Sequence, residues 1–61
     1  MLGTYARNLR KYLELSPKEV AKLAKVSSKT VDLFEREQPV QLDDRRRIMA
    51  VLYKKKASNF K

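Results

Sequence analysis

The sequence predicts an all-α protein, a compact single domain of four helices or five. Apolar residues recur every three or four positions through most of the chain, which is the period of an amphipathic helix, and strand-like alternation is nowhere sustained. One glycine and two prolines are too few to separate many short strands. A length of 61 residues allows one domain and no more.

The first helix is expected over residues 4–14. Ala6, Leu9 and Leu13 are spaced so that they fall on one side of it. We therefore expect this side to face the core.

A second helix is expected to start at Ser16-Pro17. Serine is a favoured N-cap residue, proline suits the first helical position, and Glu19 completes a capping box. Ala21 and Ala24 are small enough to let another helix approach closely. Only about two residues then separate this helix from the next, which predicts a sharp crossing between the two.

A third helix is expected over residues 27–36, with Ser27 as its N-cap. Val31 and Phe34 mark its buried side, and Val26 fills the turn before it. The second and third helices with their turn span residues 16–36.

A fourth helix is expected after a loop at residues 37–41. Asp43 or Asp44 can cap it, because acidic side chains suit the positive N-terminus of a helix. Its apolar stripe consists of Leu42, Ile48, Val51 and Leu52. We assign residues 1–53 to the domain and residues 54–61 to a basic tail, which is either mobile or an extension of the helix.

The composition limits both the stability of the fold and its chemistry. The absence of cysteine and histidine excludes a disulfide and the usual zinc sites. A small domain without such a staple is expected to have a stability of only about 3–5 kcal/mol, and dimerisation can add to it. Without these residues or a glycine-rich phosphate loop, we expect neither an enzyme nor a cofactor or small-molecule ligand.

The net charge of +8 and a pI near 10.1 favour a polyanionic partner, which is either nucleic acid or an anionic membrane surface. No apolar run approaches the roughly 20 residues that span a bilayer. The first residues lack the apolar core of a signal peptide. The expectation is a cytoplasmic protein that does not bind membranes.

The stretch from Leu9 to Glu35 carries residues of the kinds and spacing of a known motif. It resembles the helix-turn-helix of the lambda-repressor-like family, of the Cro/CI type. In that family a small residue stands at the position of Ala21, and an apolar residue fills the turn at the position of Val26. Val31 and Phe34 match the anchors of the recognition helix. The matching residues are Leu9-Arg10, Leu13, Leu15-Ser16, Glu19-Val20-Ala21, Val26-Ser27, Thr30-Val31 and Phe34-Glu35.

Three departures from the family pattern affect the expected contacts. Lys25 stands where the family usually has glycine in a left-handed conformation, which costs a lysine roughly 1–2 kcal/mol. Pro17 replaces a glutamine that often meets the DNA backbone, and the loop after the third helix lacks basic residues. We expect the backbone contacts to move to Lys18, Arg36 and the arginines that begin at Arg45.

The resemblance implies a sequence-specific regulator of transcription, a repressor, that binds double-stranded DNA as a homodimer on a near-palindromic operator. The helix at residues 27–36 would enter the major groove, with half-sites about 34 Å apart. A phage switch protein, a toxin–antitoxin regulator and a restriction controller remain alternatives. So do the excised DNA-binding domain of a longer repressor and a helix-turn-helix module that has been repurposed for protein–protein interaction.

The expected base-reading residues lie on the outward face of the third helix. Lysine can donate to guanine O6 and N7, and an apolar side chain can touch a thymine methyl group. The alternative for two of them is a simple surface pair between Lys29 and Asp32. The base-reading set is Ser28, Lys29, Asp32 and Leu33.

Phosphate contacts position a protein on DNA without reading its sequence. The expected set is Lys18, Ser27, Thr30, Arg36, Arg45 and Arg46, with Arg7, Lys11 and Lys54 to Lys56 as further candidates. Ser27 has the alternative of being only a helix cap. Arg45, Arg46 and Arg47 cannot all point the same way, because they are about 100° apart around a helix.

Two further groups of residues are expected to serve structure. Arg10 and Glu35 fall where some phage repressors have an ion pair between the first helix and the end of the third. Met49, Tyr53 and Phe60 form the expected dimer patch, and a place in the ordinary core is the alternative for each of them.

Overall fold

The computed structural model describes residues 2–59, with side chains through residue 58, and this part of the chain forms four α-helices and no strand. The helices are α1 (Leu2–Tyr12), α2 (Pro17–Ala24), α3 (Ser28–Glu35) and α4 (Leu42–Asn59). The prediction of an all-helical protein is confirmed.

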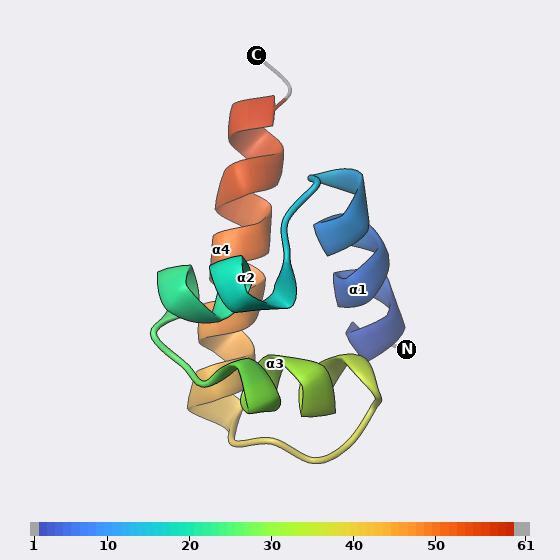
Figure 1. The fold of residues 1–61 in the computed structure, drawn as a ribbon, viewed down its shortest axis with the longest axis vertical. Coiled ribbons are helices and arrows are strands. Elements are labelled where there is room, and N and C mark those ends of the chain that lie inside the picture. The colour runs from blue at the N-terminus through green and yellow to red at the C-terminus, as the bar shows by residue number, and fades with distance from the viewer. Residues whose placement is uncertain (1, 60–61) are drawn as a thin grey trace.

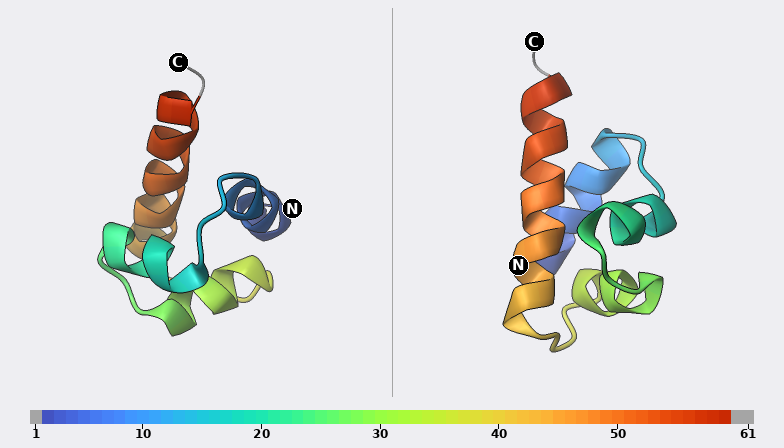
Figure 2. Two further views of the ribbon diagram at one scale, coloured as in Figure 1. Left: turned by 45° about the horizontal axis from the view of Figure 1, so that its top comes forward. Right: turned by 90° about the vertical axis from the view of Figure 1, so that its left-hand side faces the viewer.

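The longest helix sets the long axis of the molecule, which measures 33 × 22 × 18 Å (Figure 1). α1 stands beside α4, and α2 crosses in front of α4. α3 lies across one end of the long axis, and the C-terminal half of α4 reaches the other end, as both views in Figure 2 also show.

Every helix contributes to one hydrophobic core. The largest fully buried side chains are Val20, Val31, Ile48 and Leu52. The other buried apolar residues are Ala6, Leu9, Ala21, Ala24, Phe34 and Met49.

Two predictions about α4 are wrong. Met49 is only 7% exposed, because it lies on the same side of the helix as Leu52, so it cannot belong to a dimer patch. Leu42 is 48% exposed, because it is the first residue of α4, and it takes no part in a buried stripe. Tyr53 is exposed and contacts the ring of Tyr5 on α1, with the ring centres 6.5 Å apart. Phe60 lies outside the described residues.

The predicted starts of α2 and α3 are confirmed. The Ser16 hydroxyl accepts a 3.1 Å hydrogen bond from the Glu19 amide, and the Glu19 carboxylate accepts one of 3.1 Å from the Ser16 amide. Ser27 caps α3 by accepting from the Thr30 amide at 3.1 Å. The predicted cap of α4 is wrong, because α4 begins at Leu42 and its two aspartates lie within the first turn, where they still suit the helix dipole.

The first three helices end in the same way, with a non-glycine residue in the left-handed conformation. These residues are Glu14, Lys25 and Glu37, with φ values of 59°, 59° and 64°. Each stands in a Schellman motif, in which the next amide bonds back to a carbonyl five residues earlier, as from Val26 to Ala21 at 3.0 Å. The left-handed backbone expected at Lys25 is therefore present.

The first helix is shifted from its predicted range because its two ends are fixed by contacts that the apolar pattern does not contain. The Schellman turn at Glu14 ends α1 at Tyr12, and a carboxylate from beyond α3 caps its start. Gly3 is required there, because a Cβ atom would collide with the carbonyl oxygen of Phe34 and lie 2.6 Å from a Glu37 carboxylate oxygen.

The C-terminal basic segment is helical as far as the structure describes it. Of the two alternatives for residues 54–61, the helix extension is present through Asn59, and α4 crosses the expected domain boundary without a break. Within residues 2–59, no helix combines the length and the apolar character needed to cross a membrane.

Candidate nucleic-acid interface

The outward face of α3 is polar near its start. Ser28, Lys29 and Asp32 are exposed, whereas Thr30 and Leu33 are half-buried. Ser28 and Lys29 occupy the first turn of the helix and Asp32 follows one turn later. Three of the four expected base-reading residues therefore share one solvent-facing surface.

Leu33 lies at the edge of that surface. It lines a shallow cavity together with Thr30, residues 39–41 of the loop and Asp44. The side chain therefore packs towards the loop after α3 and is only partly available to a ligand of the outward face. Its neighbour Asp44 adds a negative charge beside the cavity.

Ser27 and Thr30 are engaged with each other at the start of α3. The Thr30 amide donates to the Ser27 hydroxyl at 3.1 Å, and the two hydroxyl oxygens are 2.8 Å apart. The structure therefore gives Ser27 the role of a cap. This cap fixes the first turn of α3, the turn that presents Ser28 and Lys29.

Asp32 pairs with Arg36, with 3.2 Å between a carboxylate oxygen and the guanidinium Nε, and both side chains are largely exposed. The alternative pairing of Asp32 with Lys29 is absent. Within residues 2–58, the ammonium group of Lys29 has no ion-pair partner. It is therefore available to an acceptor outside the chain.

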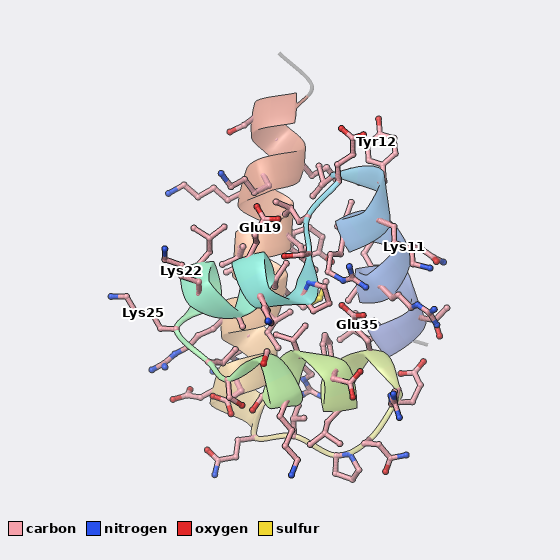
Figure 3. The ribbon with its side chains drawn as sticks, viewed as in Figure 1. Lys11, Tyr12, Glu19, Lys22, Lys25 and Glu35 are labelled. Atoms are coloured by element: carbon pink, nitrogen blue, oxygen red, sulfur yellow. The ribbon has the colours of Figure 1, made fainter. Side chains whose placement is uncertain are left out.

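Arg10 and Glu35 form the ion pair that the sequence predicted. The guanidinium donates from Nε and Nη2 to the two carboxylate oxygens at 2.6 and 3.0 Å, and from Nη1 to the carbonyl oxygen of Leu15 at 3.0 Å. The two side chains are only 11% and 9% exposed. Figure 3 shows Glu35 between α3 and α1, so the pair fixes the angle of α3 against the rest of the fold.

A cavity of about 190 Å³ between α1, the start of α2 and α3 is lined by three arginines and two acidic residues, and two of the arginines, Arg10 and Arg36, are paired with Glu35 and Asp32. Arg7 and Arg36 line it together with Pro17, and Lys18 is exposed directly after Pro17. Arg7 was only a further candidate from the sequence, and the fold brings it next to Arg36. Arg7 and Arg36 therefore lie beside α3, and Lys18 is exposed at the start of α2.

Arg45 and Arg46 do not join this group. Arg45 lines a different cavity, between the start of α1 and the loop that leads into α4, together with Gly3, Glu37 and Val40. Arg46 and Arg47 are exposed on α4, so no arginine of this run is buried against the edge of the core.

The sequence did not indicate the role of Glu37, which lies beside the interface. Its carboxylate accepts from the Gly3 amide at 2.9 Å, the Thr4 amide at 3.2 Å and the Thr4 hydroxyl at 3.0 Å. Partial desolvation by itself would raise the pKa of Glu37, but the hydrogen bonds from Thr4 and Gly3 outweigh it and lower the pKa below the ordinary value. No local signal identifies this contact, because its partners are more than 30 residues apart in the chain.

Comparison of the chain with protein-family models, with curated proteins and with solved structures found no match. The candidate functional surface is therefore identified from the geometry and charge of the chain's own residues.

Proposed function

We propose that this protein is a transcriptional repressor that binds double-stranded DNA with sequence specificity, as a homodimer on a near-palindromic operator. In this proposal α3 enters the major groove, which is about 12 Å wide and accepts an α-helix. The observation that carries the proposal is the start of α3, where Ser28 and the unpaired Lys29 stand exposed on a capped and anchored helix.

The way α3 is held supports a reading role. Base contacts discriminate only when the helix that makes them has a fixed position, because a loose side chain fits many sequences equally well. α3 is fixed at its start by the Ser27 cap, at its end by the Glu35–Arg10 pair, and along its inner side by Val31 and Phe34.

The basic residues beside α3 support contacts to the DNA backbone. Arg7 and Arg36 lie beside α3, and Lys18 is exposed at the start of α2. Phosphate contacts from such residues set the register of a protein on the duplex. Arg36 would exchange Asp32 for a phosphate when DNA is bound.

A homodimer fits the small reach of one α3 helix. Eight residues of helix contact only a few base pairs, and two copies related by a twofold axis would read half-sites about 34 Å apart. With Met49 buried, Tyr5 and Tyr53 are the exposed aromatic pair that can contribute to the contact between protomers.

The test is selection of bound duplexes from a random DNA pool at about 0.15 M salt, near physiological ionic strength. We expect enrichment of an inverted repeat. The variant Ser28→Ala/Lys29→Ala should lose that enrichment while it keeps its helical circular dichroism spectrum. Binding with no enriched sequence, at any salt concentration that still permits binding, would contradict the proposal and favour a protein partner for α3.

A further inference from the structure

A second basic surface lies along α2 and the C-terminal half of α4. A groove of about 210 Å³ runs between α2 and the C-terminal half of α4, and it is lined by Leu23, Val51, Lys54, Lys55 and Ser58. Lys22 and Lys25 are exposed at the end of α2, the helix that contributes Leu23 to this groove (Figure 3). We call Lys22, Lys25, Lys54 and Lys55 the lysine ridge.

The lysine ridge carries positive charge that the protein itself does not neutralise. All four side chains are exposed, and none has an ion-pair partner within residues 2–58. The nearby carboxylate of Glu19 accepts a hydrogen bond from the Ser16 amide in the capping box. No acidic residue lines the groove.

The position of Lys54 and Lys55 separates them from the interface around α3. α4 has 18 residues and is therefore about 27 Å long. α3 lies at one end of the 33 Å long axis and these lysines lie towards the other end (Figures 1 and 2). At physiological ionic strength charges are screened beyond about 8 Å, so Lys54 and Lys55 act independently of the outward face of α3. A duplex seated on α3 does not reach these two lysines of the same molecule.

We propose that the lysine ridge binds the phosphate backbone of a second DNA duplex, so that one protein molecule joins two duplexes. The inference rests on the proposed function for the first duplex only. Lysines act as point charges for phosphate and need no particular base sequence, which suits binding to any neighbouring DNA. An anionic membrane suits the ridge less well, because Leu23 (48% exposed) is its one large exposed apolar side chain and membrane-surface helices need a broad apolar face.

The test is a capture experiment with two duplexes. One duplex, which carries the selected operator, is fixed to beads, and a labelled 30-base-pair duplex of unrelated sequence is added with the protein. We expect the wild-type protein to retain the labelled duplex on the beads. With four phosphate contacts, its affinity for the labelled duplex should fall about 100-fold between roughly 50 and 200 mM salt.

The variant Lys22→Gln/Lys25→Gln/Lys54→Gln/Lys55→Gln should lose capture at least tenfold, while its affinity for the fixed operator changes less than threefold. Lys56→Gln is the control for Lys55→Gln, because Lys56 is half-buried and faces about 100° away on the same helix. Circular dichroism checks that each variant is folded.

Three outcomes would overturn the inference. In the first, capture persists in the fourfold variant. In the second, that variant loses the fixed operator and the labelled duplex together, which assigns the ridge to the first binding site. In the third, the ridge retains vesicles of phosphatidylserine but no second duplex. Failure of the proposed function gives a different result, in which Ser28→Ala/Lys29→Ala leaves sequence preference unchanged although capture still depends on the ridge.

Discussion

Single residues decide how this domain ends its helices. Glu14, Lys25 and Glu37 all adopt the left-handed conformation in which glycine is most at ease, while the one glycine of the chain stands at the start of α1. Glycine is required at position 3 for steric reasons, because the carbonyl of Phe34 and the carboxylate of Glu37 leave no room for a side chain. The three helix ends therefore contain removable strain.

We predict that Glu14→Gly and Lys25→Gly each stabilise the domain by about 1 kcal/mol, since the left-handed backbone costs a non-glycine residue roughly 1–2 kcal/mol and glycine returns part of this as chain entropy. Urea denaturation measures the change. Glu37→Gly is the matched comparison, and it should bring no such gain because the three hydrogen bonds to Gly3 and Thr4 are lost. Equal gains at all three positions would contradict the role given to Glu37.

Substitutions of Lys29 and Lys18 would distinguish a contact to a base from a contact to the DNA backbone. Lys29→Ala should relax the base preference at one operator position, which corresponds to about 1–3 kcal/mol of discrimination, whereas Lys18→Ala should weaken all duplexes alike. Fluorescence anisotropy with the operator and with single-base variants of it measures both effects. If Lys29→Ala weakens cognate and random DNA by the same factor, Lys29 contacts the backbone.

Between elements, two polar contacts tie α1 to α3. The Arg10–Glu35 pair joins the middle of α1 to the last turn of α3, and Glu37 caps the start of α1 from the residue that follows the end of α3. Both contacts set the angle at which α3 is presented. The position of the candidate interface on α3 therefore depends on α1, although among the described residues α1 contributes only Arg7 to that candidate interface.

We predict that Glu35→Gln destabilises the fold by about 3–5 kcal/mol, because loss of one partner leaves a buried charge unpaired. The variant should then be largely unfolded at 25 °C, by circular dichroism. Arg10→Met/Glu35→Leu, which removes both charges and keeps apolar bulk, should recover most of the lost stability. A double variant no more stable than Glu35→Gln would mean that the pair acts through its hydrogen bond to Leu15 rather than through charge.

We also predict a pH dependence that arises from Glu37. Because its pKa is lower in the folded protein, its contribution to stability is complete above the unfolded pKa of about 4.3 and is lost as the pH falls through the lowered pKa. Glu37→Gln should remove part of the fall in unfolding free energy on the acid side, measured by urea denaturation from pH 6 to 2. Glu14→Gln is the control, because Glu14 shares the left-handed backbone without side-chain hydrogen bonds in residues 2–58. An unchanged acid limb in Glu37→Gln would contradict the assignment.

For the molecule as a whole, the sequence predicted those structural features that are formed between residues close together in the chain. The Ser16 capping box, the Ser27 cap and the left-handed Lys25 all follow from patterns within about four residues. The Arg10–Glu35 pair followed from the family resemblance. The contacts of Glu37 and the approach of Arg7 to Arg36 join segments about 30 residues apart, and no local pattern contains them. The assignment of Met49 to a dimer patch was wrong for a similar reason. The side of α4 that faces the core depends on how the other helices pack against it, and the sequence of α4 alone does not contain this.

The two kinds of helix cap in this fold have a consequence for the order of folding. Ser16 and Glu19 are three residues apart and can meet in an isolated segment, whereas Glu37 reaches Gly3 across 34 positions of the chain. Closing the longer loop costs more entropy, so we expect the cap of α1 to form after the transition state. In stopped-flow measurements Glu37→Gln should accelerate unfolding and leave the refolding rate unchanged, while Ser16→Ala should slow refolding. The helix that comes first in the chain would then be the last to acquire its native start.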